Sequence, residues 1–238
     1  MTTGAMVDTH CHILPYMDDG AADLDESIAM AKIAAEDGIG KIIATPHIRD
    51  RGCHPEQILE NVEAVNQQLQ KNDIPVKIYP AAEISIGLDL PLFCQYTINH
   101  TPYILIELPF DHLPFFTDKL LAWMRAEGLW PIIAHPERNH GVMRNPAAFM
   151  DKLLPGIYLQ ITVGSLTGDF GAEVQLCAEM LLESGKVNII ASDAHSRKAR
   201  PPILSKGFEI ASRRIGRQAA SRLVCGNPEK ILAGRKMD

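Results

Sequence analysis

The amino-acid sequence predicts an α/β fold, namely a closed or nearly closed seven-stranded (β/α)7 barrel of the TIM-like kind, forming a single domain over residues 1–238. Two observations lead to this prediction. Short apolar, β-prone segments alternate with helical segments, an order that gives a parallel sheet with right-handed crossovers. Polar residues that can bind metal also recur at the ends of five such segments. In an open sheet such residues would gather at one switch point, so the barrel is favoured.

The predicted strands are short runs of mainly apolar residues with turn or polar residues beyond them. They cover residues 5–9, 41–45, 76–81, 103–107, 130–134, 157–161 and 187–191. Apolar residues between these runs repeat at helical spacing. The predicted helices begin at about residues 24 and 55, lie near 114–127, 146–154, 169–184 and 203–215, and end with a short one from 227.

The first two helices show the clearest local signals. Asp23 is a suitable N-cap with Glu26 three residues later, and Gly38 is a suitable end for the first helix. Pro55 is suited to the start of the second helix because a first-turn residue needs no backbone N–H. The residues expected to face the core from the second helix are Ile58, Val62, Val65 and Leu69.

Composition excludes several classes of protein. With 46% hydrophobic and 22% charged residues, the chain has the balance of an ordinary globular protein. A net charge of −6 argues against nucleic acid as a partner. No apolar run approaches the roughly 18 residues that a membrane span needs. Because Met1–Gly4 lacks the features of a signal peptide, we expect a cytoplasmic protein that does not insert into membranes.

Five segments near strand ends carry histidine and acidic residues. They are Asp8–His12, Thr45–His47, Ala82–Glu83, Ala134–Arg138 and Ser192–His195. Residues two apart on a strand face the same side, so the two histidines of the first segment should point together, and so should the Asp and His of the last. Closure of a barrel would bring these two pairs together. Imidazole and carboxylate groups bind divalent metals, and the sequence therefore predicts a metal cluster at the barrel mouth.

Two further acids fit the same cluster. Glu107 ends the apolar run Tyr103–Ile106, where a carboxylate is costly unless it is paired or bound to metal. Asp19 lies in Asp18-Asp19-Gly20, which also fits a plain turn. It closely follows the first pair of histidines, however, and a loop carboxylate suits a hard divalent cation. His112 is expected near the rim of this site.

Arginines also follow the strand ends, in loops that should surround the mouth. They are Arg49, Arg51, Arg138, Arg197 and Arg200. A single surface arginine is more often solvated than functional. Arg138 differs because it lies three residues after the ligand candidate His135. We therefore predict that Arg138, and with weaker support Arg49, binds an anionic substrate.

Together these motifs resemble the polymerase-and-histidinol-phosphatase (PHP) superfamily. The resemblance rests on Asp-x-His-x-His at 8–12, Thr-Pro-His at 45–47, Ala-His-Pro-Glu-Arg at 134–138 and Ser-Asp-Ala-His at 192–195. Within this superfamily, residues 12–21 and 106–112 are similar to bacterial metal-dependent protein-tyrosine phosphatases of capsule and exopolysaccharide operons. The similarity runs from about residue 6 to residue 233.

This resemblance implies a PHP fold that holds three divalent metal ions, commonly manganese, with iron or zinc as alternatives. The implied ligands of the first ion are His10, His12, Glu83 and Asp193; the second shares Glu83 and adds Glu107 and His135; the third has Asp19, His47 and His195. Arg138 matches the substrate-phosphate arginine of the family. Tyr16-Met17 and Ile48 depart from the family pattern in mouth loops, which leaves substrate preference less determined than the ligands.

The expected activity is hydrolysis of a phosphomonoester by a metal-bridging hydroxide, because coordination lowers the pKa of water to about 7. The resemblance implies a protein-tyrosine phosphatase whose substrate is an autophosphorylated bacterial tyrosine kinase. Histidinol phosphate or another small phosphate ester is the alternative substrate. A non-catalytic metal-binding regulatory protein is the alternative of another class. Such a protein would be expected to lack a ligand or Arg138, and the sequence retains them all.

The cysteines generate a first prediction. Thiol-based tyrosine phosphatases need Cys-x5-Arg, but the residues six positions after the five cysteines are Met17, Leu59, His100, Glu183 and Ile231. No cysteine should therefore act as a nucleophile, and replacing all five with Ser or Ala should leave metal-dependent phosphatase turnover in place. Loss of turnover in Cys11→Ser, with folding and metal content unchanged, would contradict this prediction.

Overall fold

The computed structural model describes residues 4–48, 54–87 and 93–237, so the substrate candidate Arg49 lies outside the described residues. The strands are β1 Met6–Cys11, β2 Ile39–Ala44, β3 His47–Ile48, β4 Lys77–Pro80, β5 Glu83–Ser85, β6 Tyr103–Glu107, β7 Trp130–Ala134, β8 Tyr158–Thr162 and β9 Val187–Ala191. All paired strands run parallel. The predicted α/β class and all seven strand positions are confirmed.

The longer helices also match the predictions. They are α1 Leu24–Glu36, α2 Pro55–Lys71, α4 Thr117–Ala126, α6 Pro146–Asp151, α8 Ala172–Glu183, α9 Ser205–Ile215 and α11 Asn227–Leu232. The unpredicted elements are α5 His140–Arg144, α7 Val163–Thr167, α10 Arg217–Ser221 and the single turns η1 Ile98–His100, η2 Pro136–Arg138 and η3 Arg222–Gly226. Elements of three to five residues are too short to display a helical repeat of apolar residues.

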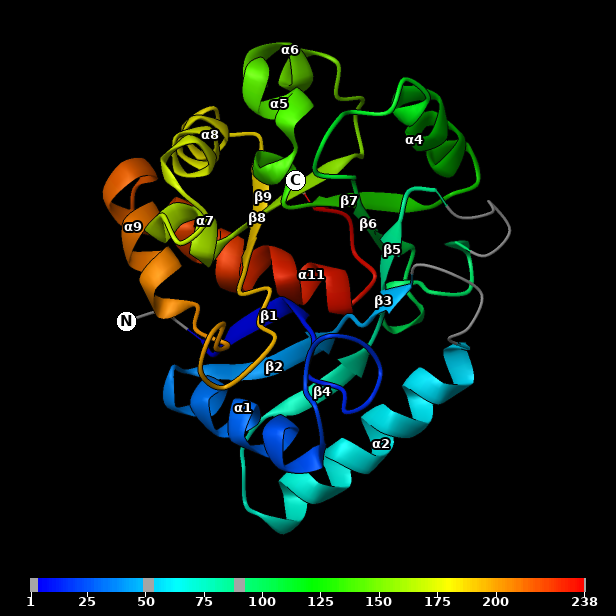
Figure 1. Ribbon diagram of the computed structural model, residues 1–238, viewed down its shortest axis with the longest axis vertical. Coiled ribbons are helices and arrows are strands. Elements are labelled where there is room, and N and C mark those ends of the chain that lie inside the picture. Colours follow the sequence, from blue (N-terminus) through cyan, green and yellow to red (C-terminus); the bar gives the residue numbers. More distant parts are fainter. Residues whose placement is uncertain (1–3, 49–53, 88–92, 238) are drawn as a thin grey trace.

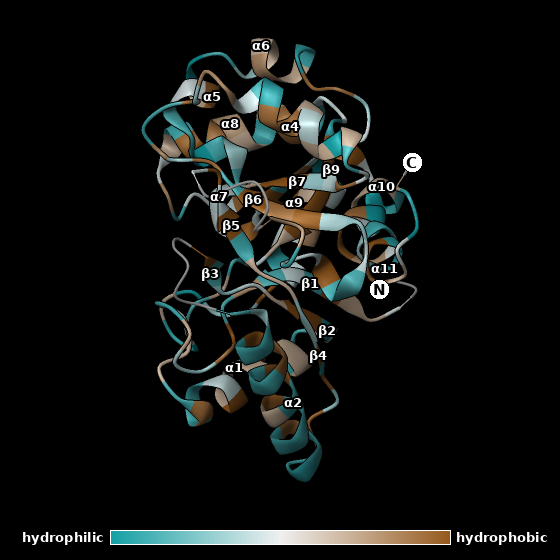
Figure 2. Ribbon diagram, turned by 90° about the vertical axis from the view of Figure 1, so that its right-hand side faces the viewer, coloured by the Kyte–Doolittle hydropathy of each residue, from teal (hydrophilic) through white to brown (hydrophobic). Residues whose placement is uncertain are grey.

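The predicted N-cap of α1 and the predicted core face of α2 are confirmed. The Asp23 side chain caps α1 by accepting a hydrogen bond from the Glu26 N–H. The apolar residues predicted on α2 are all buried. Figure 1 shows α1 and α2 on one side of the strands, with α4, α5, α6 and α8 on the opposite side. In Figure 2, hydrophobic residues gather along the central strands and hydrophilic residues cover outer helices such as α2. Among the described residues, no helix combines the length and apolar character needed to cross a membrane.

The strands form two sheets, ordered β1-β2-β4 and β3-β5-β6-β7-β8-β9. The chain breaks twice between a strand of the first sheet and a short strand of the second, because only two residues separate β2 from β3 and β4 from β5. The first break falls at Pro46, which has no N–H to donate to a ladder, while its carbonyl accepts a hydrogen bond of 3.0 Å from the Glu83 N–H. At both breaks the chain therefore passes from the first sheet to the second.

The opposite edges of the two sheets meet where β1 and β9 end. The Asp193 N–H donates to the His10 carbonyl, and the His12 N–H donates to the Ala194 carbonyl, each over 2.8 Å. This contact is a single bridge rather than a ladder. The closed seven-stranded barrel predicted from the sequence is thus not confirmed, since the described strands form two sheets that join locally.

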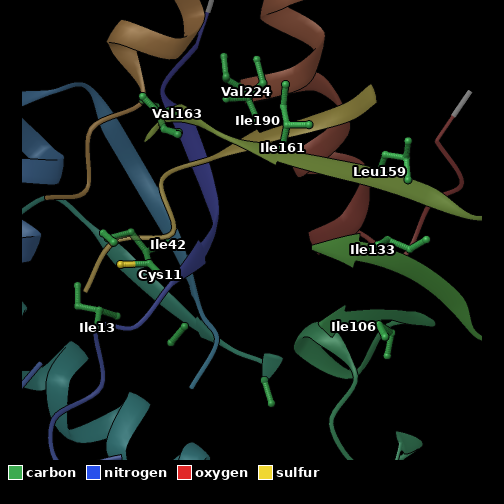
Figure 3. Packing of buried hydrophobic residues seen from close by; sticks show 14 of the residues in the cluster. Cys11, Ile13, Ile42, Ile106, Ile133, Leu159, Ile161, Val163, Ile190 and Val224 are labelled. Carbon is green, nitrogen blue, oxygen red and sulfur yellow. The ribbon is translucent and has the colours of Figure 1, made fainter. Parts of the chain in front are cut away.

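Two apolar clusters occupy the two faces of the larger sheet. Ile104 and Ile106 of β6 belong to the cluster under the helices, whereas Tyr103 and Leu105 belong to a second cluster on the other face. Figure 3 shows Ile106, Ile133 and Leu159 of the first cluster on adjacent strands. Alternation along β6 puts Glu107 on the same face as Leu105. The second cluster therefore covers the N-terminal part of the strands on this face, and polar residues such as Glu107 occupy the C-terminal ends.

Candidate metal centre

The nine predicted metal ligands converge at the C-terminal ends of the strands. They form four overlapping groups in which the candidate ligand atoms lie within 4.8 Å of one another. The groups are His12, Asp19, His47 and His195; His10, His12 and Glu83; His10, His135 and Asp193; and His47, Glu83 and Glu107. Except for Asp19, these side chains are at most about one-eighth exposed. Residues up to 185 positions apart in the chain thus form one buried cluster.

Four atoms form the centre of this cluster, and they come from the ligand set implied for the first ion. They are His10 Nε2, His12 Nε2, Glu83 Oε2 and Asp193 Oδ1. The two imidazole nitrogens lie 3.1 Å apart. Each lies 3.2–3.4 Å from the carboxylate oxygen of Glu83 and 3.4 Å from that of Asp193. Two ligands bound about 2.1 Å from one ion at tetrahedral or octahedral angles are separated by about 3.0–3.4 Å.

The hydrogen bonds of Nδ1 in His10 and His12 indicate that Nε2 is the ring nitrogen available to bind metal. His10 Nδ1 lies 2.7 Å from Gln160 Oε1, and the Gln160 amide in turn donates to Thr9 Oγ1. His12 Nδ1 lies 2.6 Å from Asp18 Oδ2. A neutral imidazole has one N–H, so each ring donates through Nδ1 and turns an unprotonated Nε2 toward the centre.

With both imidazoles neutral, the centre brings together electron pairs without protons between them. Glu83 Oε2 and His47 Nδ1 are also buried and make no hydrogen bond, although they lie only 3.0 Å apart. Buried polar atoms are rarely left without partners. A cation among these atoms would satisfy all of them at once, so the residues present fit a divalent metal ion.

The ligand sets implied for the other two ions adjoin this centre. His135 Nε2 lies 2.8 Å from Glu83 Oε1 and 3.9 Å from Glu107 Oε1, so Glu83 faces two sets with its two oxygens. Asp19 Oδ1 lies 3.6 Å from His47 Nε2 and 3.8 Å from His195 Nε2. The grouping differs from the implied sets in three respects. His12 also joins the set of Asp19, His47 and His195; Asp193 groups with His10 and His135; and His47 takes the place of His135 beside Glu83 and Glu107.

Electrostatics in the cluster follow from burial and close neighbours. Burial lowers the pKa of His195 to about 4, and His12 adds to the effect. Burial alone would raise the pKa of the Asp193 carboxyl, but His10, His12 and Arg138 around it hold that pKa well below its usual range. Burial alone would lower the pKa of His10 and His12, but the carboxylates around them, including Glu83 and Asp193, raise the pKa of both imidazoles. Because a neutral imidazole and an ionised carboxylate are the forms that bind metal, a metal ion at this centre would displace these protons.

Two of the ligands lie on strained backbone. His135 directly follows β7 with φ of 32°, and Asp193 follows β9 by two residues with φ of 53°. Non-glycine residues rarely adopt this left-handed region, which costs about 1–3 kcal/mol per residue. The chain turns sharply at both strand ends, and in doing so it directs both side chains into the cluster.

Two arginines meet the cluster at Asp193. Arg138 donates from Nη1 to Asp193 Oδ2 over 2.6 Å and from Nη2 to Thr162 Oγ1 over 2.7 Å. Arg200 donates to the same Asp193 oxygen. The Phe170 ring lies 3.8 Å from the Arg138 guanidinium carbon, and the Arg138 Nε is buried without a hydrogen-bond partner. The predicted substrate arginine is thus held in place beside the cluster with unused donors.

Sequence reasoning missed several supporting residues. Gln160 was not singled out, although a polar residue between Leu159 and Ile161 in a buried strand was a usable signal. Asp18 was seen only as part of a turn, yet its carboxylate accepts from both His12 Nδ1 and the His47 N–H. Arg200 was placed near the mouth but not distinguished from solvated arginines.

The remaining sequence expectations concern His112 and the cysteines. His112 does not join the metal groups; its side chain is 63% exposed and hydrogen-bonded to Asp111. The Cys11 side chain packs in the hydrophobic core near Ile13 and Ile42, turned away from the histidines as strand alternation predicted (Figure 3). Burial raises the pKa of the Cys11 thiol well above its usual range.

The fold and cluster define an α/β protein built around a metal-capable centre at the C-terminal ends of parallel strands. Comparison with known families identifies it more closely. Residues 6–233 match the family described as "Capsular polysaccharide synthesis, CpsB/CapC". The chain belongs to this family.

Named relatives and solved structures agree with this assignment. Tyrosine-protein phosphatase YwqE of Bacillus subtilis is 42% identical over 234 residues, covering 95% of this chain and 91% of the relative. The putative tyrosine-protein phosphatase CapC of Staphylococcus aureus is 33% identical, covering 85% and 82%. A structure from a crystallographic study of YwqE and Streptococcus pneumoniae CpsB, described as metal-dependent tyrosine phosphatases, superimposes with a TM-score of 0.92 at 37% identity, covering 98% and 96%. An organophosphorus hydrolase at 14% identity and a TM-score of 0.59 shares the fold alone.

Glu83 generates the prediction for this centre. Because its two oxygens face two ligand sets, Glu83→Gln should lose more bound metal than His47→Ala, measured by elemental analysis of protein purified without chelator. Wild-type protein should carry about two to three transition-metal ions per chain. Glu137→Gln is the matched control, since Glu137 is equally buried after β7 but accepts from the Thr162 N–H outside the metal groups. An active wild-type preparation with one ion or none would contradict the three-ion arrangement.

Proposed function

We propose that this chain is a metal-dependent protein-tyrosine phosphatase that hydrolyses phosphotyrosine on a bacterial tyrosine kinase of a capsule or exopolysaccharide system. The observation that carries the proposal is the cluster of closely spaced imidazole nitrogens and carboxylate oxygens at His10, His12, Glu83 and Asp193, directly beside two arginines. The named phosphatase relatives and the family description support the substrate and the biological setting.

The metals proposed here are three divalent ions held by the nine clustered residues, with manganese as the first candidate and iron or zinc as alternatives. When bound, they would lower the pKa of water to about 7 and offset the charge of a phosphate group. The candidate ligands include four carboxylates, Asp19, Glu83, Glu107 and Asp193. Their four negative charges leave a surplus of about two positive charges against three divalent ions, which suits a dianionic phosphate.

The chain's own residues would orient the phosphate. Arg138 is fixed by Asp193, Thr162 and the Phe170 ring, so little rotational freedom is lost when its remaining N–H groups bind an anion. The Arg200 side chain is one-third exposed and reaches the same carboxylate. Two guanidinium groups on one side of the metal cluster can hold equatorial phosphate oxygens and stabilise their charge as hydrolysis proceeds.

We further propose that residues 1–238 form a single unit whose two sheets together make a distorted PHP-type barrel. The chain crossings from β2 to β3 and from β4 to β5, with the bridge between Cys11 and Ala194, support this proposal. A cytoplasmic location is also proposed. It is supported by buried free thiols such as Cys11 and Cys177, since disulfides are rare in reducing compartments.

The proposal is tested by comparing substrates on manganese-loaded protein. A phosphotyrosine peptide should have a higher kcat/KM than the matching phosphoserine peptide or histidinol phosphate. A simple aryl phosphate serves as control, because phenolate is a better leaving group than an alkoxide whatever the enzyme recognises. If histidinol phosphate exceeds every aryl substrate, the tyrosine phosphatase assignment is wrong and a small-molecule phosphatase remains.

Arg138 provides a second prediction. Arg138→Ala should lower kcat/KM on a phosphotyrosine peptide by about 10²–10³-fold, as expected for a donor that stabilises the charge of a transferring phosphoryl group. Arg138→Lys should recover little, because one ammonium cannot replace the planar fork. Metal content must be measured alongside, since Arg138 also holds Asp193. Near wild-type kcat/KM in Arg138→Ala would show that Arg138 does not bind the phosphate.

A further inference from the structure

A groove adjoins the metal cluster and shares Glu107 with it. It has a volume of about 430 Å³ and lies between the segments that follow β5 and β6. Glu107 forms one end of it, and Ser85 lies there too, donating to Glu107 Oε2 over 3.3 Å. Because Glu107 belongs both to this groove and to a metal group, the groove is continuous with the candidate centre. We call it the Glu107 groove.

The walls of the Glu107 groove are apolar. They are formed mainly by Ile86, Leu108, Pro109, Phe110, Pro114 and Phe116. Among the described lining residues there is no lysine or arginine, and the polar side chains are Glu107, Ser85 and the largely exposed His112. A charged group would lose hydration against the apolar walls. The groove therefore suits a neutral, flat, apolar group joined to something held at the metal cluster.

Phe110 links the groove to the metal cluster directly. Its ring stacks on the ring of His135, with centroids 5.7 Å apart and planes 24° from parallel. Half of the Phe110 side chain remains exposed. An aromatic ring fixed on a ligand candidate and open on its other face can receive a second ring.

The arginines and the groove both adjoin the metal cluster. Arg138 and Arg200 donate to Asp193 Oδ2. The groove reaches the cluster at Glu107 and at Phe110, which stacks on His135. Because the ligand atom of His135 also lies within 4.8 Å of those of His10 and Asp193, the groups proposed to hold the phosphate and the apolar walls can contact one aryl phosphate.

We propose that the Glu107 groove binds the aromatic ring of the phosphotyrosine side chain, with Phe110 as its stacking wall. This inference rests on the proposed phosphatase function, and it assigns the selectivity for aryl over alkyl esters to residues outside the metal cluster. A volume of about 430 Å³ falls within the range of small-molecule sites, and a phenyl ring with one polar end matches the walls.

The test measures binding to manganese-loaded protein by calorimetry, with benzylphosphonate and methylphosphonate as probes. Both carry the phosphonate that the metals and arginines would hold, but only the first carries a ring. Wild-type protein should bind benzylphosphonate about tenfold more tightly than methylphosphonate. Phe110→Ala should lose most of this difference while methylphosphonate affinity and metal content stay unchanged, and Phe110→Trp should retain it.

Phe115→Ala is the matched control. Phe115 lies in the same loop and is 97% exposed, but it does not line the groove, so this variant should keep the wild-type difference. An equal difference in wild type and Phe110→Ala would overturn the proposal. Equal weakening of both probes in Phe110→Ala would also overturn it, because Phe110 would then act on the metal cluster through His135.

Turnover of a phosphotyrosine peptide by wild-type protein, measured in parallel, separates this inference from the proposed function. Turnover together with an unchanged ring preference in Phe110→Ala contradicts only the groove assignment. A ring preference that depends on Phe110, without phosphotyrosine turnover, supports the groove as an aryl site and contradicts the proposed function.

Discussion

The close approach of imidazole nitrogens and carboxylate oxygens at the strand ends is the constraint on which the rest of the structure depends. His10 lies on β1 in the smaller sheet and His12 directly follows that strand, whereas Glu83 belongs to β5 in the larger sheet. Without a cation, buried atoms such as Glu83 Oε2 and His47 Nδ1 lack partners. Bound metal would remove that cost and would also tie together two sheets whose hydrogen-bond ladder is interrupted. Metal binding and folding stability should therefore be coupled in this protein.

The interruption of the strands is itself part of the site. A continuous strand through Pro46 would keep His47 in register with the smaller sheet. Instead the chain crosses to the larger sheet, where His47 pairs directly opposite Glu83. The same occurs after β4, where the break at Ala81 and Ala82 immediately precedes Glu83. The departures from a regular barrel thus bring ligand candidates from consecutive strands to adjacent positions.

Much of this could be predicted from local patterns. The N-cap of α1, the apolar face of α2, the positions of the β-prone segments and the identity of the clustered residues all follow from periodicity and spacing. The split into two sheets could not, because it depends on long-range pairing such as the Pro46 carbonyl with the Glu83 N–H. For the same reason, the contacts of Asp18 with both His12 and His47, and of Gln160 with His10, were not foreseen.

The Asp193 side chain contacts both the candidate metal ligands and the two arginines. Its Oδ1 faces the free nitrogens of His10 and His12, and its Oδ2 accepts hydrogen bonds from Arg138 and Arg200. The strained backbone at this residue fixes the carboxylate between the two sets of partners. A change in metal occupancy alters the charge felt by Oδ1 and hence the hold of Oδ2 on both arginines. Because both arginines are held beside the cluster by Asp193, the same carboxylate that would help to hold metal also positions the groups proposed to bind phosphate.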